Sequence, residues 1–310
     1  MFHRIVVPLD QTYFAATALP TACALAARIG ATLALLTVLT PQLSEVATVT
    51  STDKDRQEAR HRLQGVARAT AHDCTPPMPM PIIAVRDGVP AGEILSYAEE
   101  IEADLICMAT HGRAGLKRVI VGSVAERVLH DAPVPVLLIA PDMTVTDFPV
   151  RAAVAVPLDG SPHAESALPH AVSLAKTLDA PLTLVRIWDI SAPMTTAAYA
   201  VETSQTVFDK MEEATEESVV AYLDAVAARI RGVMEVRTVH VRGGAVEGLD
   251  AFVRAERPAL VVMGTHGRGG VPRWVLGSVA FGLVRTSVAP VLLIGDACVR
   301  ASAARLSADC

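Results

Sequence analysis

The chain has 310 residues, of which 51% are hydrophobic, 4% aromatic and 19% charged. At roughly 150 residues per domain it divides into about two domains, and its apolar content excludes a disordered chain. The scarcity of aromatic residues and the formal net charge of −6 disfavour a protein that holds nucleic acid by base stacking and phosphate neutralisation. Five scattered cysteines, never spaced as C-x-x-C, predict neither a disulfide framework nor a structural zinc site.

The start of the chain has the pattern of a buried strand. Residues 1–4 lead directly into Ile5-Val6-Val7, without the charged and apolar regions of a signal peptide, so we expect a cytoplasmic protein.

The stretch from Leu19 to Pro41 is long enough to span a bilayer, but it contains Arg28 and Gly30 and changes from an Ala-rich helical pattern to a β-prone one. A helix, a turn and a buried strand explain it better than a membrane segment.

In chain order, β-prone apolar runs alternate with helical patterns. The first part predicts a strand at 4–9, a helix at 13–29, a strand at 32–38, a helix at 53–71, a strand at 82–86, a helix at 91–101, a strand at 104–109, a helix at 123–131 and a strand at 135–140. The second part predicts strands at 152–158, 181–187, 235–241, 259–264 and 290–295, separated by helices at 162–178, 205–231, 246–256 and 278–287.

The two parts are copies of one pattern. Val7-Pro8-Leu9-Asp10 recurs 149 residues later as Val156-Pro157-Leu158-Asp159, and Thr110-His111-Gly112-Arg113 recurs 155 residues later. Repeats of this length are whole domains rather than solenoid units. We expect two domains and a small Ala-rich tail, at residues 1–146, 147–298 and 299–310.

The alternation of elements predicts the fold class. Nearly continuous apolar strands are typical of parallel sheets that helices cover on both faces. We therefore expect an α/β protein with two repeated doubly wound domains, each built on a five-stranded parallel sheet. In such sheets ligands bind outside the carboxyl ends of the strands, where the strand order reverses.

A glycine-spaced loop follows the fourth strand of the second copy. It begins at Gly264, continues through Gly267 and Arg268, and reaches Gly277 and Ser278 at a helix start. Glycines allow a backbone to approach a ligand closely, and the expected Ser278 N-cap would start a helix whose positive end attracts anions. The loop matches neither a Walker nor a Rossmann motif, and it predicts a phosphate site. The alternative is that the glycines shape a turn and Ser278 only caps a helix.

Asp159 follows the first strand of the second copy, next to the expected position of this loop. Its carboxylate could bind ribose hydroxyls or an adenine amino group. Asp159, and Asp10 in the first copy, could equally be N-caps of the helices that follow them.

These residues resemble those of the universal stress protein family. The resemblance is carried by the V-P-L-D start, the D-G-S at 159–161 and the G-2x-G-9x-G-S pattern that ends at Gly277-Ser278, and it covers both halves as a tandem. It implies a strand order of 3-2-1-4-5 and binding of ATP, often with a divalent ion such as Mg²⁺ or Mn²⁺. It also implies a regulatory role in stress, and fifth strands that pair across a two-fold, here between the chain's own halves or in a homodimer.

The resemblance implies specific nucleotide contacts. In the second half they are Pro157, Asp159, Ile187, Met263, Gly264, Gly267, Arg268, Gly277, Ser278 and Val279. In the first half they are Pro8, Asp10, Val38, Met108, Ala109, Gly112, Arg113, Gly122, Ser123 and Val124.

The first half departs from the family pattern twice. Ala109 replaces the first glycine, and Gln11-Thr12 replace Gly-Ser after the aspartate. An alanine is acceptable at a negative φ, but it obstructs the site at a positive φ or where a phosphate needs the space. The second half is therefore the better-supported site.

No residue is assigned a catalytic role. His111 and His266 lack an adjacent nucleophile motif, so we expect them to shape the loops or contact a dimer partner. No metal-spaced cluster is present, and a metal would arrive with the nucleotide. The sequence favours an ATP-binding stress-response regulator with an unidentified protein partner. The alternatives are a nucleotide-free dimeric interaction scaffold and, less favoured, a slow ATPase.

Overall fold

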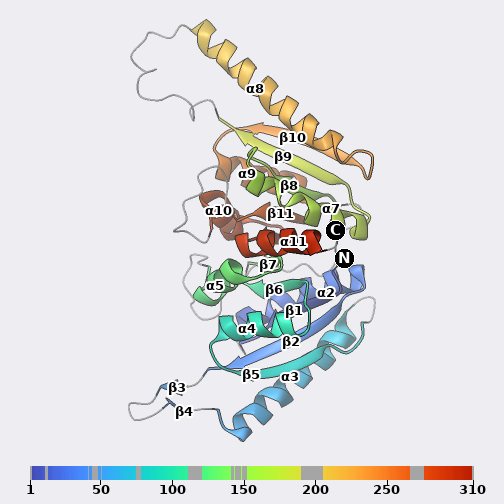
Figure 1. The fold of residues 1–310 in the computed structure, drawn as a ribbon, viewed down its shortest axis with the longest axis vertical. Helices are drawn as coiled ribbons and strands as arrows, with labels where there is room; N and C mark the ends of the chain where they lie inside the picture. The colour runs from blue at the N-terminus through green and yellow to red at the C-terminus, as the bar shows by residue number, and fades with distance from the viewer. Residues whose placement is uncertain are drawn as a thin grey trace.

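The computed structural model describes residues 2–10, 13–40, 42–43, 48–49, 51–74, 78–110, 121–140, 143, 148, 152–189, 205–265 and 276–308. The first half (Figure 1) contains β1 (Arg4–Pro8), α1 (Tyr13–Ala16), α2 (Ala18–Ile29), β2 (Thr32–Leu39), β3 (Gln42–Leu43), β4 (Thr48–Val49), α3 (Asp53–Asp73), β5 (Ile82–Asp87), α4 (Pro90–Glu100), β6 (Leu105–Ala109), α5 (Ser123–Asp131) and β7 (Val136–Ile139). The second half contains β8 (Val154–Pro157), α6 (Pro162–Glu165), α7 (Leu168–Leu178), β9 (Leu182–Trp188), α8 (Gln205–Ala228), β10 (Val236–Arg242), α9 (Ala245–Glu256), β11 (Leu260–Gly264), α10 (Ser278–Thr286), β12 (Val291–Ile294) and α11 (Asp296–Ala308).

One ten-stranded sheet runs through both halves, in the order β10-β9-β8-β11-β12-β7-β6-β1-β2-β5. Each half therefore has the order 3-2-1-4-5, and its neighbouring strands are parallel. The halves meet through their fifth strands, β7 and β12, which pair antiparallel with Leu137 opposite Leu292. The predicted fold class, two repeated doubly wound domains, is confirmed.

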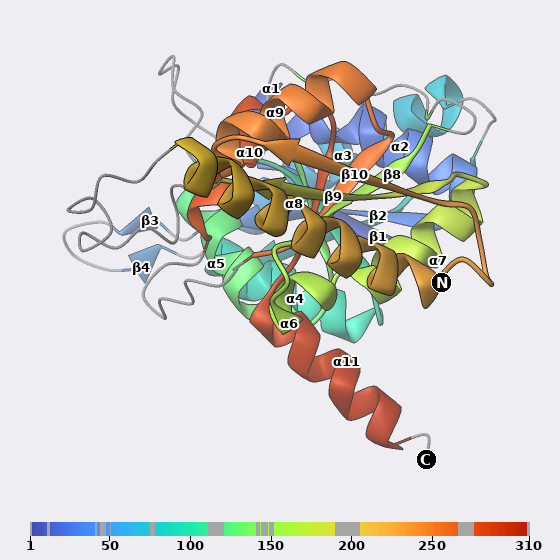
Figure 2. The same cartoon turned by 90° about the horizontal axis from the view of Figure 1, so that it is seen from above.

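Helices cover both faces of the sheet (Figure 2). One hydrophobic cluster joins the sheet to α2, α3, α7 and α8, and a second joins the opposite face to α4, α5, α9 and α10. The residues of β6 alternate between them: Leu105, Cys107 and Ala109 belong to the first cluster, and Ile106 and Met108 to the second. Burial on both faces is the reason why the strands are nearly continuous apolar runs.

The largest differences from the predicted helix ranges are two divided helices and the extent of the last helix. The helix predicted at 13–29 is divided into α1 and α2, and the one at 162–178 into α6 and α7. Pro20 and Pro169 lie in the first turns of α2 and α7, where a missing backbone N–H is tolerated best. α11 begins three residues before the predicted tail at 299–310 and extends through most of it, and the β3–β4 pair was not predicted. Within the described ranges, no helix is long and apolar enough to cross a membrane.

The halves are joined by close packing beside the paired strands. Gly295 follows β12, and a Cβ there would lie 2.6 Å from the carbonyl oxygen of Leu129 in α5 of the first half. Arg28 of α2 donates from Nη2 to the carbonyl oxygen of Leu178, at the end of α7, over 3.1 Å. α11 begins directly after Gly295 and packs against α5. The last helix of the second half is thus anchored on the first half.

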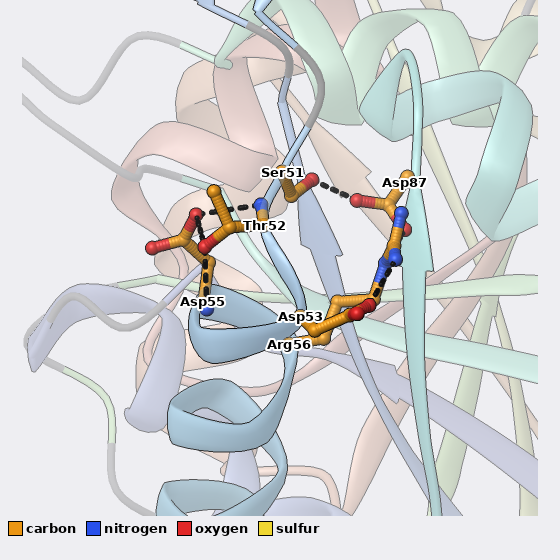
Figure 3. Close-up of polar contacts among 6 residues, drawn as sticks. All are labelled: Ser51, Thr52, Asp53, Asp55, Arg56 and Asp87. Carbon is orange, nitrogen blue, oxygen red and sulfur yellow. Dashed lines mark hydrogen bonds and ion pairs between the residues drawn. The ribbon is translucent and has the colours of Figure 1, made fainter.

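A polar cluster fixes the start of α3 (Figure 3). The Thr52 side chain accepts from the Asp55 N–H at 3.2 Å, and Asp55 Oδ2 accepts from the Thr52 N–H at 2.8 Å, which together form a capping box. The hydrogen bonds from Thr52 lower the pKa of Asp55. Arg56 bonds Asp53 at 3.1 Å and Asp87, the last residue of β5, at 2.7 Å. The helix start is thereby tied to the edge of the sheet.

The contact between the halves makes Gly295 sensitive to substitution. Gly295→Ala should lower the free energy of unfolding by about 1–3 kcal/mol, because the new methyl group overlaps the Leu129 carbonyl and the backbone must shift. The control is Gly232→Ala, whose Cβ would have no neighbour within 4 Å. Urea denaturation of both variants measures the difference, and an unchanged Gly295→Ala protein would show that the halves do not press together here.

Candidate nucleotide site

The strand order reverses at β8 and β11 in the second half, and at β1 and β6 in the first. β8 pairs with β9 on one side and with β11 on the other, so the carboxyl ends of β8 and β11 lie side by side. We call this edge the switch point of each half. Asp159 follows β8, and the glycine loop follows β11. The fold thus brings the two sequence features together where doubly wound sheets bind their ligands.

The N-terminus of α10 is the main polar feature of this edge. Its N-cap is Gly277, with φ −61° and ψ 157°, and Ser278 is the first helical residue, so the predicted Ser278 cap is wrong. The Gly277 N–H donates to the carbonyl oxygen of Thr265 at 2.7 Å, which places the helix start beside the end of β11. A glycine N-cap supplies no side-chain acceptor to the first amides, so their partial positive charge faces outward.

The first half repeats this geometry. Gly122 is the N-cap of α5, with φ −66° and ψ 153°, and its N–H donates to the carbonyl oxygen of Thr110 at 2.9 Å. Ser123 is again the first helical residue rather than the cap. The two loops are therefore closed at the base by the same backbone hydrogen bond.

Asp159 shapes the turn after β8. Its Oδ1 accepts from the Ser161 N–H at 2.9 Å, and Ser161 caps α6 by accepting from the Ala164 N–H at 3.1 Å. Gly160 between them has φ +86°, which explains the glycine in D-G-S. Asp159 is therefore not the N-cap of α6. In the first half Asp10 follows β1 and is exposed.

Apolar side chains flank the switch point on the face of α9 and α10. Met263 belongs to the hydrophobic cluster of that face, and Ile187 and Val279 pack against it. A Cβ at Gly248 of α9 would lie 2.8 Å from Ile187 Cγ2, so α9 holds this side chain closely. In the first half Met108, Val38 and Val124 occupy the equivalent places. Pro157 and Pro8 end β8 and β1.

Gly264 is a glycine because of its packing. Its φ is not in the left-handed region, so the backbone alone would accept another residue. A Cβ at Gly264, however, would lie 2.7 Å from His163 Cδ2 and 2.8 Å from the His163 carbonyl oxygen in α6. Ala109, its counterpart, has no positive φ either and packs in the cluster on the α2 face, away from Met108 and Val124. The Ala109 methyl group therefore lies on the opposite face of the sheet from Val38, Met108 and Val124.

Four predicted contacts, Gly112, Arg113, Gly267 and Arg268, lie outside the described residues, as do His111 and His266. The structure brings the other predicted contacts of each half to its switch point.

A polar network beside Asp159 was missed by the sequence analysis. Glu165 of α6 accepts from Tyr222 Oη at 2.9 Å and from Arg229 Nη2 at 2.6 Å, and Arg186 of β9 stacks over the Tyr222 ring at 4.7 Å. Burial alone would raise the pKa of Glu165, but the hydrogen bonds from Arg229 and Tyr222 outweigh it and lower that pKa. Burial and the bond to Glu165 raise the pKa of Tyr222. The network fixes α8 to the short helix that follows Asp159.

The described residues contain no group of three or more His, Cys, Asp or Glu side chains that could hold a metal ion. Cys23, Cys74, Cys107 and Cys298 are buried, and no disulfide joins these four. Burial raises the pKa of Cys107 to about 12, which makes this thiol an inert part of the core.

The contact between Gly264 and His163 predicts that Gly264 tolerates substitution less well than a glycine with open space around it. Gly264→Ala should lower the free energy of unfolding by about 1–3 kcal/mol, because α6 must move to admit the methyl group. Gly92→Ala in α4 is the control, since its Cβ would have no neighbour within 4 Å. Thermal denaturation compares the two, and equal melting temperatures would contradict the packing explanation.

The lowered pKa of Glu165 predicts a pH-dependent effect of its removal. Glu165→Gln should cost about 1 kcal/mol at neutral pH, a modest value because Glu165 and Arg229 are 26% and 58% exposed. The ionised carboxylate stabilises the fold above its ordinary pKa of 4.5, and this contribution is lost as the pH falls through the lowered value in the folded state. Urea denaturation from neutral pH downward should show the gap to wild type closing below 4.5, and a gap independent of pH would contradict the assignment.

Comparisons with known proteins find matches to both halves of the chain. A family model described as "Universal stress protein family" matches residues 1–140 and 152–295. A universal stress protein of Mycobacterium tuberculosis is 30% identical over 193 residues, which are 62% of this chain and 62% of that protein. One of Methanocaldococcus jannaschii is 55% identical over 53 residues, 17% of this chain and 31% of the relative. The chain thus matches less than two thirds of the length of these curated relatives.

Among solved structures, a universal stress protein from Archaeoglobus fulgidus is similar over 94% of this chain and 98% of its own, with a TM-score of 0.66 and 21% identity. A functionally unknown protein from Pseudomonas aeruginosa covers 99% and 98%, with a TM-score of 0.59 and 16% identity. At these identities the structures show a common tandem fold.

Proposed function

The chain belongs to the universal stress protein family, and we propose that it is a stress-response regulator that binds ATP at the switch point of its second half. One observation carries the proposal: the N-terminus of α10, with a glycine N-cap, is held beside the end of β11 by the Gly277–Thr265 hydrogen bond. A helix start of this kind attracts phosphate through its backbone N–H groups and its dipole. We further propose residues 1–146 and 147–298 as the two domains.

The residues present fit an adenine nucleotide. The amides of Ser278 and Val279 would donate to phosphate oxygens, and the Asp159 carboxylate would accept from a ribose hydroxyl or the adenine amino group. Ile187 and Met263 supply the apolar surface against which a base can pack. Because the chain has few aromatic residues, aliphatic side chains would pack against the adenine base.

A divalent ion would be held through the phosphates of the nucleotide. This follows from the oxygen ligands that Mg²⁺ and Mn²⁺ prefer, which a triphosphate supplies itself. The proposal contains no hydrolytic step, because the sequence assigns no general base or nucleophile.

A charge at the first position of α10 tests the proposal without harming the helix. Ser278→Asp places a carboxylate where it stabilises the helix dipole but repels phosphate, so ATP should bind at least about tenfold more weakly. Ser278→Ala is the control, because it removes the hydroxyl but keeps the backbone amide. Isothermal titration of the full chain with ATP and Mg²⁺ measures both.

The result also separates the proposed function from its alternative. If the wild-type chain does not bind ATP at millimolar concentration, the nucleotide-free interaction scaffold is the better account. Equal ATP affinities of the wild-type and Ser278→Asp proteins would show that the phosphates do not bind at the N-terminus of α10.

A further inference from the structure

We propose that His163 is a positioning residue: it holds the base of the glycine loop in the second half through a line of contacts, Thr265–His163–Asp296. The inference rests on the proposed nucleotide site and names the residue that sets its geometry. His163 lies in α6, between the end of β11 and the start of α11.

The two nitrogen atoms of the His163 ring face different partners. Nδ1 lies 3.2 Å from Asp296 Oδ1, and Nε2 lies 3.5 Å from Thr265 Oγ1. The carboxylate favours the proton on Nδ1, and the tautomer that carries it there leaves Nε2 able to accept from the Thr265 hydroxyl. The His163 side chain is only 20% exposed, and its ring and carbonyl oxygen lie against Gly264. The ring is therefore held on three sides.

Thr265 connects the His163 ring to the N-terminus of α10. Its N–H donates to the Ile294 carbonyl oxygen at 3.1 Å, and its own carbonyl oxygen accepts from Gly277 at 2.7 Å. Thr265 itself is 2% exposed. Fixing the Thr265 side chain therefore also fixes the carbonyl group to which Gly277, the N-cap of α10, donates its hydrogen bond. Asp296, at the other end of the line, is the first residue of α11, the helix that packs against α5 of the first half.

The first half lacks every member of this line except the threonine. The repeat offsets place Phe14 opposite His163, Ala109 opposite Gly264 and Pro141 opposite Asp296. A histidine packed on Gly264 leaves no room for a methyl group, whereas Ala109 is accommodated in the first half. The change from glycine to alanine is thus one of three sequence differences at the positions that hold the loop base in the second half, rather than an isolated change.

Two amide substitutions separate the contacts of His163. The side-chain amide of Gln can reach the place of Nε2, and that of Asn the place of Nδ1. His163→Gln should therefore keep the Thr265 contact, and His163→Asn only the Asp296 contact. Both replace the imidazole by a primary amide, and they differ from each other by one methylene group.

The readout is the intrinsic fluorescence of the full chain during ATP titration. Both tryptophans, Trp188 and Trp274, belong to the second half, so the signal reports that site. His163→Gln should bind ATP within about twofold of wild type, whereas His163→Asn should lose roughly three- to tenfold, the worth of one hydrogen bond. Equal affinities of the Gln and Asn variants would overturn the positioning role.

Hydrogen exchange without nucleotide gives an independent measurement. The Gly277 amide should exchange faster in His163→Asn than in wild type or His163→Gln, because its acceptor, the Thr265 carbonyl, is less firmly placed. If the wild-type chain fails to bind ATP, the proposed function is wrong, and the exchange result still decides the role of His163. Unchanged exchange in His163→Asn would overturn it.

Discussion

A single backbone hydrogen bond at the base of each glycine loop sets the geometry of the candidate site. It runs from Gly277 to Thr265 in the second half and from Gly122 to Thr110 in the first, with lengths of 2.7 and 2.9 Å. The bond brings the two ends of the loop together, so the following helix must begin at the edge where the strand ends. The sheet supplies the fixed support, since Thr265 and Thr110 also donate to Ile294 and Ile139 of the fifth strands. A positively polarised helix start is thus placed beside the switch point in both halves.

The packing around this bond differs between the halves more than the bond itself does. In the second half α6 carries both His163, which lies on Gly264, and Glu165, which joins Tyr222 and Arg229 on the far side. This four-residue helix is therefore fixed on both flanks, although it is too short to be stable alone. Its position in turn constrains the Asp159 turn. The chemistry expected of the loop thus depends on residues outside the glycine motif.

The sequence was sufficient for the repeat, most of the elements and the fold class, because these follow from local patterns. Apolar runs with β-prone residues mark buried parallel strands, and the two offsets reveal the domains without any contact information. The division of the predicted 13–29 helix into α1 and α2 is also a local effect, since Pro20 lies in the first turn of α2 and has no backbone N–H to donate to the preceding turn.

The site was less predictable, because its decisive contacts join residues far apart in sequence. Ser278 has the side chain of an N-cap, but the bond to Thr265 makes Gly277 the boundary residue. Gly264 looked like a glycine required by a ligand or a turn, and only the structure shows His163, 101 positions earlier, lying against it. Glu165 and Tyr222 are 57 positions apart, with no motif to connect them. Periodicity and spacing carry no information about such pairs.

In the proposed site the N-terminus of α10 receives the phosphates of an adenine nucleotide. A crystal structure of the full chain with a non-hydrolysable ATP analogue would show where the phosphates bind. We expect phosphate oxygens within hydrogen-bonding distance of the Ser278 and Val279 amides, with the base against Ile187 and Met263. Phosphates bound elsewhere on the chain, with the start of α10 in contact with solvent alone, would contradict it.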